Sequence, residues 1–278
     1  MTGPKPIRIE TWDWQEAPAK ASRQVFAIGD IHGRADLLEA LHMEIRRVAR
    51  PGALLVHLGD YIDKGPWSVR TLRMALDGVE GLEVVNLPGN HEQLMASVLL
   101  ASHNELTELL GVWLDNGGRD VARELGCDMS AEDTRTSTTF LGAVRGALGE
   151  RRLDRFFAMP NHVYVGGYLF VHGGVNPAVP IAELLARDWR RRDVDEDVDP
   201  LWVRWPFFAH EELFEGGVVV VHGHTPRDQP ELLTNRINLD TRANDSGRLT
   251  MAEFDGNRFR ITQTHGRARR PGSSELEE

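Results

Sequence analysis

The chain alternates between short apolar runs and longer stretches in which apolar residues recur at helical spacing. Three runs, Val25–Ile28, Leu54–Leu58 and Leu82–Leu87, each stop at a glycine-containing turn, which is typical of buried strands. Between them, apolar residues recur every three or four positions over 37–48 and again over 69–76, which predicts two helices. Strand, helix and strand in that order predict a layered α/β fold.

The pattern changes over residues 92–158. Helical spacing covers Glu92–Trp113 and Thr139–Phe157, on either side of a middle rich in Gly, Asp and Thr. We expect this segment to form a helical insertion, or cap. Strand-like runs return at Val163–Val171 and Val218–Val221, so the insertion interrupts a sheet fold that resumes after it.

One catalytic domain is predicted over residues 23–265, with the insertion inside it. Residues 1–22 contain three prolines and are expected to form a leader that adds an edge strand around Ile7–Glu10. Residues 266–278 are expected to be a flexible tail. An Asp-Gly dipeptide between two apolar runs predicts a hairpin over 249–262.

Composition narrows the class of protein. With 278 residues, 41% of them hydrophobic and 27% charged, the chain can bury a sizeable core, so we exclude a disordered or fibrous protein. A net charge of −10 argues against stable nucleic-acid binding. The single cysteine excludes an intrachain disulfide and a thiolate zinc site. We find no signal peptide and no apolar run near the ~20 residues of a bilayer span, and we expect a cytoplasmic protein without membrane contact.

Five apolar runs end in a polar cluster that contains glycine. Asp30, Asp60 and Asn90 lie 30 residues apart, about one strand–helix–strand unit each. Successive parallel strands would bring them to one edge of a sheet, where open α/β sheets bind ligands. Carboxylate, amide and imidazole donors suit divalent cations such as Mn²⁺, Fe²⁺ or Zn²⁺. The clusters are GDIHG at 29–33, GDYIDKG at 59–65, GNHE at 89–92, HGG at 172–174 and HGHT at 222–225.

Each cluster alone is typical of a turn or loop, but five in this order indicate a metal site. The order GDxHG, GDxxDxG, GNHE, HGG and GHT resembles the phosphoprotein phosphatase branch of the metallophosphoesterases over residues 24–262. Pro226, where the wider superfamily often has a second histidine, favours this branch. The resemblance implies an α/β fold with two central sheets flanked by helices, a four-layer α/β/β/α sandwich with a helical cap insertion.

The resemblance also implies two divalent metal ions, with manganese expected and iron or zinc as alternatives. A water or hydroxide that bridges the ions would attack phosphorus directly, without a covalent enzyme intermediate. The implied ligands are Asp30 and His32 for the first ion, Asp60 as the bridge, and Asn90, His172 and His224 for the second.

The same resemblance assigns the residues that act on the phosphate and the leaving group. His91 would protonate the leaving oxygen, and Asp63 would orient its imidazole. Lys64 and Pro88 stand where relatives usually carry arginine. Because lysine lacks the planar fork of a guanidinium, Lys64 is expected to be a weaker phosphate ligand than arginine.

A second phosphate-binding arginine is expected between the HGG and HGHT clusters. We favour Arg204, because its neighbours within Leu201–Trp205 are apolar and suited to a pocket wall. The run Arg190–Arg192 is expected to be a solvated face that balances nearby acidic residues, and Arg187 is a further candidate. Among the other histidines, His57 is expected in the core.

Two further groups of histidines are interpreted from their context. His222 points the same way as His224 on a strand and is expected to pack or to form a hydrogen bond. His42 is expected on the surface, as are the four histidines at 103, 162, 210 and 265.

The leading interpretation is a metal-dependent phosphoric monoester hydrolase. Its partners would be phosphorylated proteins or peptides, with phosphoserine and phosphothreonine as substrates, phosphotyrosine as a further one, and small phosphate esters. The alternative is a diadenosine tetraphosphate hydrolase with the same metal centre, although relatives of that type commonly lack the Asp63 partner of His91. A third class, a scaffold that binds phosphoproteins without catalysis, is disfavoured by the intact ligand positions.

Overall fold

The computed structural model describes residues 7–131 and 133–268. Its larger sheet has the strand order β1-β12-β11-β3-β4-β5, with β2 paired to β12. As predicted, β3, β4 and β5 are parallel, while β11 joins β3 in antiparallel fashion. The strands are β1 (Arg8–Thr11), β2 (Gln15–Glu16), β3 (Val25–Ile28), β4 (Leu54–His57), β5 (Glu83–Asn86), β11 (Arg248–Asp255) and β12 (Arg258–His265).

A second sheet has the order β6-β7-β8-β10-β9. Its central strands β7, β8 and β10 are parallel, and β6 and β9 close the edges in antiparallel pairs. The strands are β6 (His162–Val165), β7 (Tyr168–Val171), β8 (Val219–His222), β9 (Glu231–Leu232) and β10 (Arg236–Asn238).

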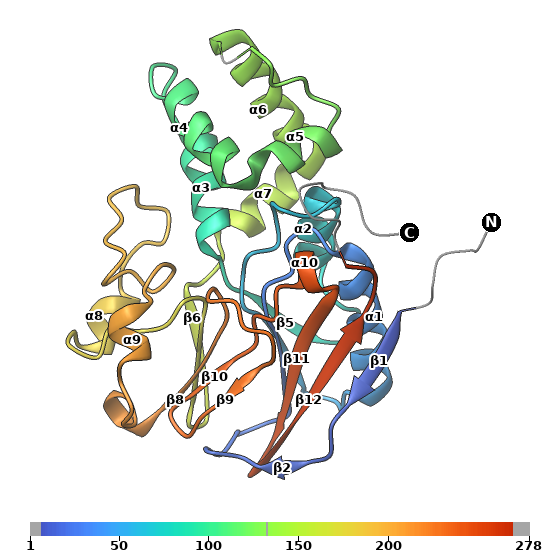
Figure 1. The fold of residues 1–278 in the computed structure, drawn as a ribbon, viewed down its shortest axis with the longest axis vertical. Helices are drawn as coiled ribbons and strands as arrows, with labels where there is room; N and C mark the ends of the chain where they lie inside the picture. The colour runs from blue at the N-terminus through green and yellow to red at the C-terminus, as the bar shows by residue number, and fades with distance from the viewer. Residues whose placement is uncertain (1–6, 132, 269–278) are drawn as a thin grey trace.

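The two sheets pack face to face, and helices cover their outer faces (Figure 1). Val56, Phe170 and Phe254 belong to the buried cluster that the sheets share, since side chains alternate across each strand. The outer face of the larger sheet packs on α1 and α2, and that of the smaller sheet on α8 and α9. The four-layer α/β/β/α sandwich is therefore confirmed. The helices are α1 (Ala35–Val48), α2 (Ser68–Asp77), α8 (Ile181–Leu185), α9 (Trp205–Phe208), α10 (Ala243–Ser246) and the 3₁₀ turn η2 (Glu215–Gly217).

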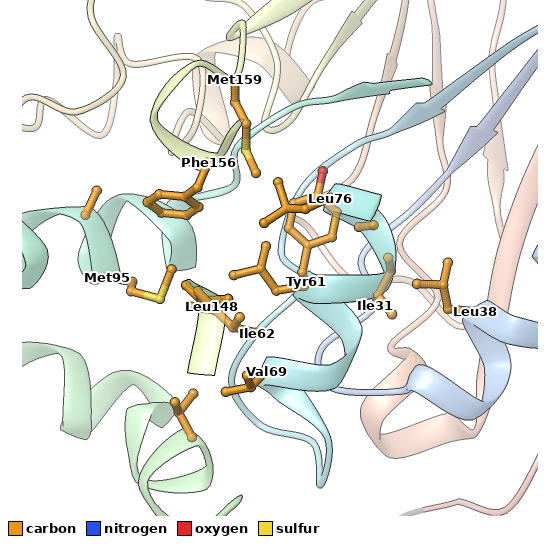
Figure 2. Packing of buried hydrophobic residues seen from close by; sticks show 14 of the residues in the cluster. Ile31, Leu38, Tyr61, Ile62, Val69, Leu76, Met95, Leu148, Phe156 and Met159 are labelled. Carbon is orange, nitrogen blue, oxygen red and sulfur yellow. The ribbon is translucent and has the colours of Figure 1, made fainter. Parts of the chain in front are cut away.

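The predicted insertion is helical and forms a cap beside one end of the sandwich (Figure 1). Met95, Leu148 and Phe156 of the cap pack against Ile62 and Leu76, which lie in and near α2 (Figure 2). The cap thus shares one buried hydrophobic cluster with the core. Its helices are α3 (Asn90–Leu99), α4 (Leu106–Trp113), the π-helical turn η1 (Leu114–Gly118), α5 (Arg119–Glu124), α6 (Thr134–Leu148) and α7 (Glu150–Phe157).

Three predicted elements are wrong in their extent. The helical stretch Glu92–Trp113 forms two helices, α3 and α4, with residues 100–105 between them. The single run Val163–Val171 is a hairpin of β6 and β7, because Gly166 adopts a φ of +62° and turns the chain. The helical stretch Thr139–Phe157 is broken at Gly149, where φ is +72°. The C-terminal hairpin of β11 and β12 is confirmed. Within the described residues, every helix is too short or too polar to cross a bilayer.

Candidate metal centre

Three predicted ligands come from the larger sheet. Asp30 follows β3, Asp60 follows β4, and Asn90 opens α3 after β5, so the parallel strands bring all three to one sheet edge. The turns after β4 and β5 touch. Gly59 has a φ of +105°, and a Cβ on it would lie 2.6 Å from the backbone nitrogen of Gly89. Glycine is required here because a side chain would push the two turns apart.

Two further predicted ligands come from the second sheet. His172 follows β7, and His224 lies just beyond β8 with a φ of +65°. The backbone N–H of His224 donates to both carboxylate oxygens of Asp30, at 3.1 and 3.0 Å. A Cβ on Gly223 would overlap the Asp30 carboxylate, so this glycine admits the contact. The centre therefore lies where the ends of both sheets meet.

Asp60 lies between two groups of candidate metal ligands. Its Oδ2 is 3.3 Å from His32 Nε2, and its Oδ1 is 3.5 Å from His172 Nε2. Asn90 Oδ1 is 3.1 Å from His172 Nε2 and 3.0 Å from His224 Nδ1. A carboxylate that turns one oxygen to each group suits a bridging ligand. The groups are His32 with Asp60 and His91, and Asp60 with His172 and His224.

Hydrogen bonds to the backbone fix which nitrogen of each predicted histidine ligand carries the proton. One ring nitrogen faces a carbonyl oxygen, to which it must donate, so the other presents its lone pair to the centre. A nitrogen lone pair repels an acceptor oxygen that lies 3.0–3.5 Å away. A cation bound between the two atoms attracts both of them and so removes the repulsion. This donor set therefore fits divalent metal ions. The bonded pairs are His32 Nδ1 with Ile62 O at 2.8 Å, His172 Nδ1 with Leu58 O at 2.8 Å, and His224 Nε2 with Trp202 O at 3.1 Å.

The charges of the centre agree with that fit. Asp30, Asp60 and Asp240 are all buried at 2–4% exposure, and burial of carboxylates together is unfavourable without a compensating charge. Burial raises the pKa of Asp30, and the charges of Asp240 and Asp60 raise it further. Burial also raises the pKa of Asp240 to about 6. Burial would raise the pKa of Asp60 too, but the surrounding histidines, His172 foremost, hold it below its usual value.

The predicted acid pair is in hydrogen-bond contact. His91 Nδ1 lies 2.7 Å from Asp63 Oδ2, and its Nε2 lies 3.9 Å from Asp60 Oδ2, so the ring faces the centre. Since a carboxylate only accepts, Nδ1 donates and Nε2 is turned toward the reacting region. Both side chains are buried, at 4% and 0% exposure.

The two predicted phosphate ligands have different neighbours at the centre. Lys64 Nζ is 3.1 Å from His32 Nε2. Arg204 precedes α9 and is exposed, yet it is close enough to the histidines to act on them. Burial lowers the pKa of His172 and His224, and the positive charge of Arg204 adds to that lowering.

The other candidate arginines are paired at the surface. Arg190 binds Asp188, and Arg191 binds Asp193, as expected for a solvated face. The two remaining pairs are Arg192 with Glu105 and Arg187 with Asp199.

Sequence reasoning missed three buried residues at the centre. Asp240 follows Leu239 just after β10, and a position soon after a strand is the signal that also marks Asp30 and Asp60. Trp113 donates its indole N–H to Asp63 from the cap, and nothing in the local pattern indicates that contact. Glu92 accepts four backbone N–H groups from both turns. The donors are Gly89 and Asp60 at 2.8 Å, Tyr61 at 3.0 Å and Ile62 at 3.3 Å.

Comparison with known proteins agrees with this geometry. Residues 23–262 match the family model for the calcineurin-like phosphoesterases, and the chain belongs to that family. It is therefore a phosphoesterase whose buried donor set fits metal binding.

Individual relatives carry different names. The asymmetrical bis(5'-nucleosyl)-tetraphosphatase PrpE of Bacillus velezensis is 25% identical over 267 residues, which cover 86% of this chain and 97% of the relative. Serine/threonine-protein phosphatase 1 of Salmonella typhimurium is 34% identical over 105 residues, 38% of this chain and 44% of the relative. The crystal structure of a cold-active protein-tyrosine phosphatase from Shewanella has a TM-score of 0.50 at 17% identity, covering 82% of this chain and 75% of that one, and shares the fold.

Proposed function

We propose that this phosphoesterase hydrolyses phosphomonoesters of alcohols, with phosphoserine and phosphothreonine in proteins as its substrates and phosphotyrosine and small phosphate esters as further ones. The contact that carries the proposal is the 2.7 Å hydrogen bond between His91 Nδ1 and Asp63 Oδ2. A serine or threonine alkoxide is a poor leaving group that must be protonated as it departs. A nucleotide phosphate leaves as a stable anion and needs that proton far less.

The residues of the centre have separate tasks in this reaction. Asp30, His32, Asp60, Asn90, His172 and His224 would hold two divalent cations, which when bound neutralise phosphoryl charge and lower the pKa of a water. We propose manganese, with iron or zinc as alternatives, because the donors are oxygen and imidazole nitrogen.

The remaining assigned residues bind the phosphate and supply the proton. Lys64, beside His32, and Arg204, whose charge acts on His172 and His224, would bind phosphate oxygens. His91 would deliver a proton from Nε2 to the leaving oxygen, while Asp63 holds its Nδ1–H.

Hydrolysis of dinucleoside tetraphosphates is the second candidate. It is supported by the named tetraphosphatase of Bacillus velezensis, whose similarity covers 97% of that relative. The serine/threonine phosphatase of Salmonella matches over a shorter stretch. The same centre could serve either substrate, because substrate choice depends on the surrounding pocket rather than on the fold.

A direct comparison of substrates tests the proposal. The protein is stripped with a chelator, reloaded with Mn²⁺, and assayed on phosphoserine, phosphothreonine and phosphotyrosine peptides and on diadenosine tetraphosphate. We expect a higher kcat/KM on the phosphoserine peptide than on the dinucleotide. Asp63→Asn should reduce peptide hydrolysis more than dinucleotide hydrolysis. Asp77→Asn, which removes only an exposed ion pair with Arg152, is the matched control.

The opposite order of substrates would assign the second function. We further propose a cytoplasmic location without membrane contact. The net charge of −10 argues against a stable partnership with nucleic acid. Cell fractionation checks the location.

A further inference from the structure

The carboxylate of Asp63 receives a second hydrogen bond, and its donor belongs to the cap. Trp113, the last residue of α4, places its indole Nε1 3.1 Å from Asp63 Oδ1 and 3.0 Å from Oδ2. The indole is 1% exposed and the carboxylate 0% exposed. In this setting a hydrogen bond to a charged oxygen is stronger than it is in water.

The cap holds this indole from several sides. Its ring stacks on Phe140 of α6, with ring centroids 5.5 Å apart and an angle of 29° between the planes. A Cβ on Gly118 would lie 3.1 Å from the Trp113 ring. A Cβ on Gly117 would lie 2.9 Å from Asp63 Cβ, so the turn η1 packs directly against the acid pair. The Trp113 indole and the main chain at Asp63 are therefore both held in place by the cap.

We infer that Trp113 is a positioning residue for the reaction, one that fixes the Asp63 carboxylate so that His91 presents Nε2 to the leaving oxygen. The inference rests on the proposed function and adds a residue from the cap to it. The indole N–H spans both carboxylate oxygens, while His91 bonds to Oδ2 alone. Without the indole, the carboxylate can rotate about its Cβ–Cγ bond, and the imidazole follows. The cap thus acts on the chemistry through this contact.

Trp113→Phe tests this, because phenylalanine keeps an aromatic ring beside Phe140 and removes the N–H. It also removes part of the buried ring, and the control variant below accounts for that loss. We expect kcat on a phosphoserine peptide to fall about tenfold, the scale of one hydrogen bond to a charged group, with KM within about twofold. Hydrolysis of p-nitrophenyl phosphate, whose leaving group needs little protonation, should change by less than about twofold. An unchanged ratio of the two rates would overturn the inference.

The matched control is Trp189→Phe. Trp189 is also a buried indole, and its Nε1 donates to Met159 O at 2.9 Å, away from the acid pair. This variant loses a comparable hydrogen bond and should leave the ratio of the two rates as in the unmodified protein. If both variants change the ratio alike, the effect comes from general loosening of the fold, and the inference fails.

Nuclear magnetic resonance of the protein loaded with diamagnetic Zn²⁺ gives a readout that does not need activity. Asp63→Asn should shift the indole ¹H–¹⁵N signal of Trp113 and leave that of Trp189 in place. The downfield proton of His91 Nδ1–H should persist in Trp189→Phe and be shifted or lost in Trp113→Phe. A protein that hydrolyses no phosphomonoester contradicts the proposed function, whereas a His91 signal that ignores Trp113→Phe contradicts this inference alone.

Discussion

Two groups of buried histidines border strand β4, and they differ in what their free nitrogens face. One group surrounds Asp60 just after the strand. The other is a pair, in which His42 Nε2 lies 2.9 Å from His57 Nε2, and His57 Nδ1 lies 2.7 Å from Asn86 Oδ1. The side-chain Nδ2–H of Asn86 donates to Ala75 O, which identifies the other side-chain atom as the oxygen. Asn86 Oδ1 therefore accepts a hydrogen bond from His57 Nδ1. His57 Nε2 then accepts a hydrogen bond from His42 Nε2, so both ring nitrogens of His57 have a hydrogen-bond partner.

Burial is common to both groups and does not define the metal centre. It lowers the pKa of His42 to about 2 and that of His57 to about 4, so both rings are neutral, as metal ligands must be. At the centre, however, His172 Nε2 and His224 Nδ1 turn lone pairs toward acceptor oxygens of Asp60 and Asn90, whereas in the pair each described contact joins a donor to an acceptor. A shared carboxylate, and not desolvation, distinguishes the centre. The following variants test this distinction, and the largest expected effect comes first.

Asp60→Asn should abolish tight binding of both metal ions at once, because it replaces the one carboxylate that faces both groups. Elemental analysis and calorimetric titration with Mn²⁺ should show two ions per chain in the unmodified protein and a loss at both sites in the variant. Asp77→Asn should keep both ions. Retention of two ions by Asp60→Asn, or a single site in the unmodified protein, would refute the dinuclear reading of the centre.

His91→Asn should reduce kcat on a phosphoserine peptide by about 10²–10⁴-fold, the usual contribution of a general acid. The loss on p-nitrophenyl phosphate should be smaller. His42→Asn makes the same chemical change in the His42–His57 pair and should leave kcat near that of the unmodified protein. Equal losses on the two substrates would contradict the role assigned to His91.

Lys64→Ala should reduce kcat/KM on a small phosphate ester by about five- to thirtyfold, equivalent to about 1–2 kcal/mol of transition-state binding. Lys64→Arg should hold or raise the activity, since a guanidinium binds two phosphate oxygens at once. If Lys64→Ala keeps the parental kcat/KM, Lys64 is not a phosphate ligand and its contact with His32 has another purpose.

The smallest effect concerns the free energy of unfolding at mildly acidic pH. Because burial depresses the pKa of His42 below the unfolded value of about 6.5, the unfolded chain binds the extra proton first, and stability falls as pH drops below about 6.5. At pH 6 this amounts to about 0.8 kcal/mol. His42→Gln keeps a donor for His57 and removes the titration. Urea unfolding of both metal-free proteins at pH 8 and pH 6 should show the smaller loss in the variant, and equal losses would refute the assignment.

Sequence alone predicted the parts of the centre that obey strand geometry. Asp30 and Asp60 follow apolar runs, and parallel strands must bring such residues to one edge. His42 was wrongly expected at the surface, although it is 7% exposed and lies four residues after the buried Leu38 on α1. The spacing of four residues from Leu38 indicates the buried face of the helix. The position was not counted as buried because histidine is a polar residue.

Contacts of the cap could not be predicted in this way. Trp113 reaches Asp63 across 50 residues of sequence, and that contact depends on how α4 packs on α6 and on the turn η1. Local periodicity predicts that the segment is helical, yet it contains no information about which helix end meets the acid pair. The hairpin at Gly166 was missed for a related reason, since both of its strands are apolar.

The carboxylate of Glu92, which gathers N–H groups from the turns after β4 and β5, bears on how the protein takes up metal. Three main-chain N–H groups of the segment around Asp60 donate to the Glu92 side chain and so tie that segment to the start of α3, where Gly89 N–H donates to the same carboxylate. The ligand cradle is thus preorganised by folding, and an arriving cation has little chain to order. Little of the free energy of cation binding is then lost to ordering the loops, and the affinity is correspondingly higher. Apo and metal-loaded protein should accordingly share one backbone, and a cation should bind without a slow ordering step.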